Sequence, residues 1–171
     1  MKTLASTGVS SHVASSVATI DCDYVAWLLG QAEALRQAEP DFLDWQNLAE
    51  ELEAMARNEE RALESYFVIL LSHLLLKYLY QGGKITGSWE ATIENSRERI
   101  AKLLRRSPSL KSKLEGIFTE AYPMARRGAG AEMGFRKRAW EQRLPQACEW
   151  TLETVLNVDF WPAAFAEAKG N

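Results

Sequence analysis

The sequence predicts an all-α protein, a helical bundle around a long central helix. Apolar side chains recur at three- and four-residue steps along most of the chain, which is the period of an amphipathic helix. Neither proline nor glycine occurs between Asp41 and Gln81. No segment alternates apolar and polar residues over the length of a strand.

The chain has 171 residues, which fits one domain. Residues 3–19 mix Ser, Thr, Ala and Val without the continuous apolar run of a secretion signal. We therefore expect a disordered N-terminal tail followed by a single all-α domain over residues 21–171. Asp21 or Asp23 can cap the first helix, which must end before Pro40. Its predicted apolar face carries Tyr24, Trp27, Leu28 and Leu35.

The second helix is predicted to be the central one. Asp44 can cap it, and from Phe67 to Leu76 it is apolar on nearly all sides, which places this part at the centre of the protein. We expect one helix of roughly 35 residues, ending at Gly82-Gly83. A break near Arg57–Glu60, where four polar residues are consecutive, is the alternative. The stripe that faces the core consists of Leu48, Leu52, Met55, Ala62, Tyr66 and Leu70.

Local signals also divide the second half of the chain into helices. Ser88 can cap a third helix. Ser107-Pro108 ends it and starts a fourth, with serine at the N-cap and proline at the first helical position. Pro123 should kink or end the fourth helix. Three glycines indicate looser chain beyond it, namely Gly128, Gly130 and Gly134.

The C-terminal part is predicted to close onto the core. Thr151 can cap a short helix through Leu156. Large aromatic residues follow in Asp159-Phe160-Trp161-Pro162. We expect this segment to pack as a clasp, because its rings have the largest apolar surface to bury.

Charge is unevenly distributed, although the formal net charge is only −3. Residues 21–60 hold eleven acidic and two basic side chains, whereas residues 91–143 hold thirteen basic and six acidic ones. Either the two parts neutralise each other within the protein, which we favour, or the basic part meets an anionic partner such as nucleic acid.

The cysteines and the apolar runs suggest a cytoplasmic protein. Cys22 and Cys148 stand in no metal-ligand spacing and are expected to be reduced thiols. The longest apolar run, Tyr66–Leu76, is too short for a bilayer, which needs about 20 apolar residues. We therefore expect no contact with a membrane.

Seven motifs occur in a characteristic order and spacing. They are Asp23-Tyr24-Val25-Ala26-Trp27-Leu28-Leu29, Asp44-Trp45-Gln46-Asn47-Leu48-Ala49-Glu50-Glu51-Leu52-Glu53, His73-Leu74-Leu75-Leu76-Lys77 with Tyr80-Gln81, Ser88-Trp89-Glu90-Ala91-Thr92-Ile93, Ser107-Pro108-Ser109-Leu110-Lys111, Cys148-Glu149-Trp150-Thr151-Leu152-Glu153 and Asp159-Phe160-Trp161-Pro162. Together they resemble the bacterial family called domain of unknown function 29, over about residues 21–162. The resemblance implies an all-helical fold and supplies no reaction. The chain departs from the family's usual pattern at Ala56-Arg57-Asn58-Glu59, where the family tends to read Gly-Arg-Ser-Glu, and at Glu149, which replaces a usual proline.

His73 is the strongest candidate for a catalytic group. It lies in the most apolar part of the chain, with Lys77 one turn later and Tyr80 two turns later on the same face. One interpretation is a general base with a tuned pKa. The interpretation we favour is a core histidine with its hydrogen bonds satisfied, beside a lysine that extends to solvent.

Arg97 falls between Ile93 and Ile100 and is therefore predicted to point toward the core. A buried arginine needs partners, and we expect an ion pair with Glu51 or Glu50 of the second helix. An enzyme would use a polar cluster of Glu51, His73, Lys77 and Arg97.

We expect no metal and no cofactor. The two histidines, His12 and His73, stand in no Glu-x-x-His or Cys/His spacing. A magnesium site made only of Glu50, Glu51 and Glu53 is the weaker alternative, because a run of Glu on a helix is usually a solvated face. Gly82-Gly83-Lys84 lacks the other elements of a P-loop.

A nucleic-acid interface is the main alternative function. Three cations fall on one face of the third helix, and a second basic tract contains a tryptophan that could stack on a base. The candidates are Arg99, Lys102, Arg106, Arg136, Lys137, Arg138 and Trp140. The bland alternative is a solvated surface with Glu98–Lys102 pairing.

The absence of catalytic motifs favours a non-enzymatic protein that acts through contact with a protein partner or through self-association. Nucleic-acid binding by residues 97–143 is the second hypothesis. The third is an enzyme that uses the polar cluster.

Overall fold

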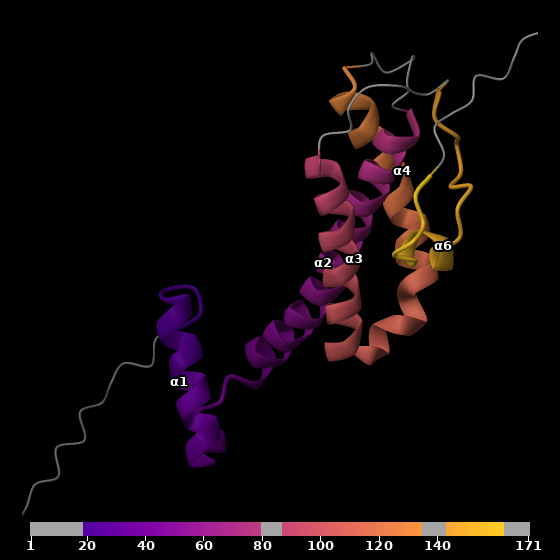
Figure 1. The fold of residues 1–171 in the computed structure, drawn as a ribbon. Helices are drawn as coiled ribbons and strands as arrows, with labels where there is room; N and C mark the ends of the chain where they lie inside the picture. The colour runs from indigo at the N-terminus through magenta and orange to yellow at the C-terminus, as the bar shows by residue number, and fades with distance from the viewer. Residues whose placement is uncertain (1–18, 80–86, 135–142, 163–171) are drawn as a thin grey trace, which may run out of the picture. The chain divides into compact units, whose positions relative to one another are not determined.

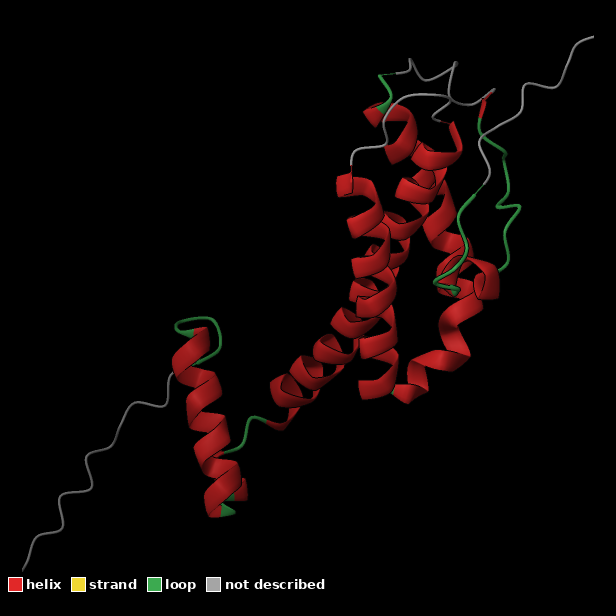
Figure 2. Cartoon of the chain, viewed as in Figure 1, coloured by secondary structure: helices red, strands yellow, loops and turns green. Residues whose placement is uncertain are grey.

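The computed structural model describes residues 19–79, 87–134 and 143–162. All regular structure in these ranges is helical, and they contain no strand (Figures 1 and 2), which confirms the predicted fold class. The chain divides into two compact units, one ending at Ala54 and the other beginning at Met55. We call their described parts the N-terminal unit and the C-terminal unit. The tail predicted for residues 1–20 falls outside the described residues, except for its last two.

The N-terminal unit begins with α1 (Tyr24–Gln37). The Asp23 carboxylate accepts a hydrogen bond from the Ala26 N–H at 2.9 Å, so Asp23 is the cap. The helix ends before Pro40 as predicted, and Ala38 takes a left-handed conformation with φ of 55°. Of the expected apolar face, Trp27 is buried, but Tyr24 and Leu35 are exposed.

A buried glutamine holds the connection between the first two long helices. The Gln31 side-chain amide donates to the Phe42 carbonyl at 3.3 Å, and its oxygen accepts the Asp44 N–H at 2.7 Å. The connection contains a short 3₁₀ helix, η1 (Pro40–Phe42). Asp44 then caps α2 through the Asn47 N–H, as predicted. Gln31 thus satisfies main-chain groups that the turn would leave unpaired.

The central helix α2 (Trp45–Leu79) is continuous over 35 residues, so the alternative of a break near Arg57–Glu60 is wrong. It extends from the N-terminal unit into the C-terminal unit. The part from Phe67 to Leu76 contributes most of its buried residues, as expected. The predicted core stripe, however, does not run its full length, because Leu52 and Met55 are 60% and 63% exposed.

By length and composition α2 could also cross a membrane, since an 18-residue window has a mean hydropathy of 1.4. Within the protein, 44% of that window is buried. The core helix of a folded domain meets the same criteria, so this property carries no membrane assignment.

Helix α3 (Gly87–Arg106) is antiparallel to α2 in the C-terminal unit. Successive contacts link Lys77 to Glu90, Tyr66 to Arg99 and Glu59 to Arg106. Residue numbers therefore fall along α2 as they rise along α3, which is the pattern of two antiparallel helices. The helix begins one residue before the expected cap, Ser88.

The chain after Ser107 forms a 3₁₀ helix, η2 (Pro108–Lys113), and then α4 (Leu114–Glu132). Pro123 does not end α4, and Gly128 and Gly130 lie inside it rather than in loose chain. The glycines allow close packing here. Gly128 lies beside Ser72, whose hydroxyl donates to the Ala125 carbonyl at 3.2 Å.

The core of the C-terminal unit is closed by α6 (Leu152–Leu156), whose cap Thr151 accepts the Thr154 N–H at 3.1 Å as predicted. Val155 is fully buried, and Phe160 and Trp161 pack against the same core, which confirms the expected clasp. Phe67 and Phe118 meet edge to face at its centre.

Two glycines of α4 provide a matched test of this packing. We expect Gly116→Ala to raise the free energy of unfolding by about 0.5–1 kcal/mol, because alanine is the better helix former and its Cβ meets no atom within 4 Å. Gly128→Ala should raise the free energy of unfolding by less than Gly116→Ala does, or should lower it, because its Cβ would lie 3.3 Å from the Ser72 hydroxyl. Urea unfolding measures both, and equal gains would contradict the packing described.

Candidate functional site

Arg97 is a buried polar side chain of the C-terminal unit that makes several hydrogen bonds. It is 5% exposed, and its guanidinium donates to three main-chain carbonyls, those of Val155 at 2.9 Å, Val158 at 3.2 Å and Phe160 at 2.7 Å. Burial lowers the pKa of Arg97, and the charge of Glu94 opposes this shift. The fork of fixed donors suits three separate acceptors.

The expected ion pair of Arg97 with Glu51 or Glu50 is wrong. The partners of Arg97 are carbonyl oxygens of the C-terminal segment, and Glu51 accepts the Tyr24 hydroxyl at 2.7 Å. That hydrogen bond is the main cause of the raised pKa of Tyr24. The core position predicted for Arg97 is confirmed.

Lys77 reaches the same C-terminal segment. Its ammonium lies 3.8 Å from the centre of the Trp161 ring and 3.2 Å from the Glu90 carboxylate. The Arg97 guanidinium carbon lies 5.5 Å from the same ring centre. Lys77 is therefore a partner of the clasp, not a lysine extended freely into solvent.

His73 makes a hydrogen bond within its own helix. Its Nδ1 lies 2.9 Å from the Ile69 carbonyl oxygen, which can only accept, so Nδ1 carries the proton. The bond orients the ring within α2 and leaves Nε2 as the acceptor nitrogen, so this contact is compatible with a structural role and with that of a general base. Tyr80, the third member of the predicted face, lies outside the described residues.

The four residues of the predicted polar cluster thus have different surroundings. The structure brings Lys77 and Arg97 together at Trp161. His73 makes its hydrogen bond within α2. Glu51 is bonded to Tyr24 in the N-terminal unit.

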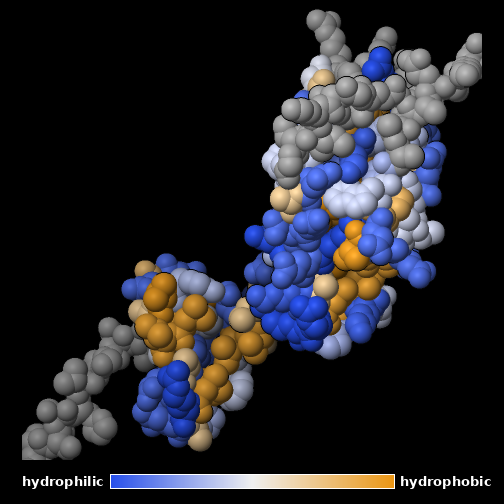
Figure 3. Space-filling model, viewed as in Figure 1, coloured by the Kyte–Doolittle hydropathy of each residue, from blue (hydrophilic) through white to orange (hydrophobic). Residues whose placement is uncertain are grey.

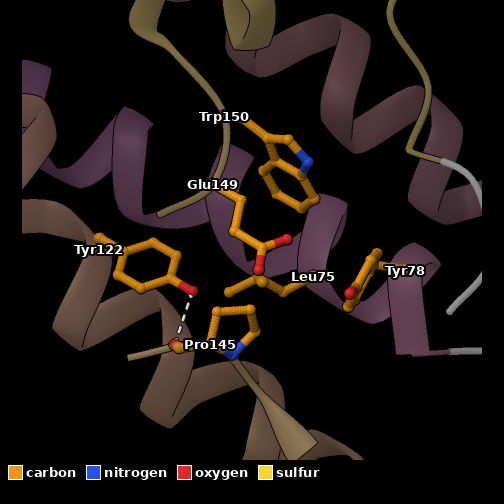
Figure 4. A pocket seen from close by; sticks show the side chains of 6 residues that line it. All are labelled: Leu75, Tyr78, Tyr122, Pro145, Glu149 and Trp150. Atoms are coloured by element: carbon orange, nitrogen blue, oxygen red, sulfur yellow. Dashed lines mark hydrogen bonds between the residues drawn. The ribbon is translucent and has the colours of Figure 1, made fainter. Parts of the chain in front are cut away.

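The sequence did not predict a pocket around Tyr122 in the C-terminal unit. Figure 4 shows the Glu149 side chain extending between Tyr122 and Trp150. The Tyr122 hydroxyl donates to the Pro145 carbonyl at 2.9 Å. Burial raises the pKa of Tyr122 to about 12, and the charges of Cys148 and Glu149 add to the shift.

This pocket is too small for a substrate. Its cavity measures about 10 Å³, which is about the minimum that holds one water. Burial also raises the pKa of Cys148, so its thiol is less ionised than usual. A reactive cysteine requires the opposite shift.

The basic candidates of α3 lie around an open groove of about 340 Å³. Its lining consists of Tyr66, Arg99, Lys102, Leu103 and Arg106. The expected alternative, a Glu98–Lys102 pair, is not among the ion pairs of the described residues. The other basic candidates, Arg136, Lys137, Arg138 and Trp140, lie outside the described ranges.

No group of three or more His, Cys, Asp or Glu side chains in the described part of the chain could hold a metal ion. The run Glu50, Glu51 and Glu53 is not such a group. The two cysteines are not bonded to each other.

Sequence reasoning missed residues whose partners lie in irregular chain. Arg126 donates to the Leu144 carbonyl through two of its nitrogens, at 3.2 and 2.7 Å. In the sequence nothing distinguishes it from the many other basic residues. Tyr122 and Tyr66 occupy positions in apolar helical stripes, and the period alone cannot show that their rings border a pocket or a groove.

Replacing Arg97 should loosen the C-terminal segment. We expect Arg97→Ala to lower the free energy of unfolding by about 3 kcal/mol, because it leaves one buried and two partly buried carbonyls without their donor. Arg97→Lys should restore only part of this, since one ammonium cannot reach three acceptors. Urea unfolding followed by tryptophan fluorescence measures the loss. Arg105→Ala, an exposed change on the same helix, is the control, and an equal loss there would contradict this role.

Tyr122 should make the protein less stable at alkaline pH. Its pKa is about 12 when folded and about 10 when unfolded. Between these two values the folded state binds more protons than the unfolded state. The contribution of Tyr122 to the free energy of unfolding is therefore complete below pH 10 and is lost as the pH rises toward 12. Urea unfolding at pH 8–11 should show a shallower alkaline decline in Tyr122→Phe. An unchanged decline would assign it to other groups, among them Tyr78, whose pKa burial also raises.

The comparisons place the chain in a family and assign no activity. Searches against curated proteins and against solved structures found no match. The sequence matches the family model described as "Domain of unknown function DUF29" over residues 20–161, which confirms the resemblance. Because this match covers most of the chain, the protein belongs to the DUF29 family, whose function is uncharacterised.

Proposed function

We propose that this protein acts through protein–protein contact made by its N-terminal unit, and that the partner presents an apolar surface edged with basic side chains. The observation that carries the proposal is the number of large apolar side chains exposed on this small acidic unit. Of the eleven such side chains exposed in the described structure, seven belong to it. They are Tyr24, Val25, Leu29, Leu35, Phe42, Trp45 and Leu52.

These side chains include some of the most exposed in the protein. Leu29 is 66% and Trp45 60% exposed. Figure 3 shows apolar side chains gathered on the surface of this unit beside polar ones. Monomeric proteins rarely leave a large contiguous apolar patch in contact with water, and such patches mark interaction sites.

Charge indicates the chemistry of the partner. Residues 19–54 hold nine acidic side chains and one basic one, Arg36. Two such units would repel each other, whereas a basic surface would be attracted. We therefore assign the contact to a different, basic protein rather than to a second copy.

A groove of about 250 Å³ in this unit offers an anchor point. It is lined in part by Phe42, Asp41 and Asp44, and the hydrogen bond from Asn47 is the main cause of the lowered pKa of Asp44. The buried Trp27 Nε1–H makes no hydrogen bond of ordinary geometry, although it lies near enough to Asp44 to favour the charged form. A partner could place a cationic side chain beside the Asp41 and Asp44 carboxylates here.

A synthetic amphipathic helix of leucine and lysine tests this contact with the full chain. We expect the labelled peptide to bind at least tenfold more tightly than a serine-for-leucine control of equal charge. Leu29→Ser should weaken binding at least tenfold, because burying a leucine contributes about 1.5–3 kcal/mol. Fluorescence anisotropy measures both.

The matched control is Met124→Ser, which changes an exposed apolar residue of the C-terminal unit and should leave binding unchanged. Equal affinity for the two peptides would contradict the apolar contact. A dimer in light scattering that Leu29→Ser abolishes would replace the basic partner with a second copy.

A further inference from the structure

We propose that the groove lined by Tyr66, Arg99, Lys102, Leu103 and Arg106 binds the sugar–phosphate backbone of a single-stranded nucleic acid. This site lies wholly in the C-terminal unit and is independent of the protein contact proposed above. Its volume of about 340 Å³ falls within the usual range for ligand sites.

Two of the three cations of the groove make contacts within the protein before any ligand arrives. The Arg99 guanidinium carbon lies 5.6 Å from the centre of the Tyr66 ring, a cation–π contact. Arg106 is paired with Glu59 of α2. Side chains that are already ordered lose less entropy on binding than free surface lysines do.

The groove keeps uncompensated positive charge. Among the ion pairs of the described residues, neither Arg99 nor Lys102 has a carboxylate partner. Only Arg106 is partly neutralised, and its side chain remains 67% exposed. A phosphate entering the groove would therefore meet two unpaired cations and a third that it shares with Glu59.

The spacing of the cations favours a single strand. Arg99, Lys102 and Arg106 span eight residues of one helix, and the rise from the first to the last is about 10 Å. A nucleic acid strand carries one phosphate per ~3.4 Å of helix axis and is more widely spaced when extended. The row is therefore long enough for two or three consecutive phosphates of one strand.

The remaining two residues give the groove an apolar side. Leu103 is 6% exposed, and the half-buried Tyr66 ring borders the opening. Grooves that combine backbone-tracking cations with an aromatic ring are typical of sequence-independent binding to single strands.

Anisotropy of a fluorescein-labelled 12-mer of deoxythymidine tests this groove in the full chain. We expect binding at 50 mM NaCl and about 20-fold weaker binding at 200 mM, as the release of counterions by three contacts predicts. Arg99→Glu and Lys102→Glu should each weaken binding at least tenfold. Lys102→Arg, which keeps the positive charge, should bind as tightly as the unchanged protein.

Arg105→Glu is the matched control, because it makes the same charge change at an exposed position on α3 outside the groove, and it should change affinity less than twofold. Circular dichroism and thermal unfolding check that each variant is folded. No binding at 50 mM NaCl overturns the proposal. So does an equal loss in Arg105→Glu, which would show general electrostatic attraction. Binding of inorganic phosphate or of a poly-glutamate peptide without the oligonucleotide would assign the groove to another anion.

Discussion

The structure of the C-terminal unit depends on one buried guanidinium, that of Arg97, which must find hydrogen-bond acceptors. Arg97 lies in the core, no carboxylate of the described ranges is paired with it, and the carbonyls of Val155, Val158 and Phe160 accept its hydrogen bonds. An arginine in an apolar core is tolerated only when its donors are paired. The segment that supplies these carbonyls is thereby joined to α3, and Trp161 is placed where Lys77 and Arg97 both reach its ring.

The two units bury their side chains in different ways. The C-terminal unit has a continuous core contributed by α2, α3, α4 and α6. The N-terminal unit buries little besides Trp27, Gln31 and Ala34, and its connection relies on the hydrogen bonds of Gln31. Small units bury a smaller fraction of their surface, and most of this one's large apolar residues remain exposed. That difference explains why a contact with a partner is assigned to the N-terminal unit.

Some charged side chains of the C-terminal unit form ion pairs between helices, and others have no such pair among the described residues. On the contact between α2 and α3, Glu59 neutralises Arg106 and Glu90 neutralises Lys77. Arg99 and Lys102 lie between these pairs without a carboxylate among the described residues. Within the described C-terminal unit these two cations therefore remain without a carboxylate partner, and they lie beside an open groove.

The sequence by itself determined the helical class, the caps Asp44 and Thr151, and the core position of Arg97, because periodicity and capping are local properties. It left open whether α2 is continuous and whether Asp21 or Asp23 caps α1, and the structure decided both. Only the tertiary structure decided which groups meet. It showed that Arg97 uses carbonyls, that Leu52 and Met55 are exposed, and that α4 continues through Pro123 and Gly128. The physical reason is that irregular segments supply these partners and neighbouring helices supply this burial, and neither has a period that the sequence displays.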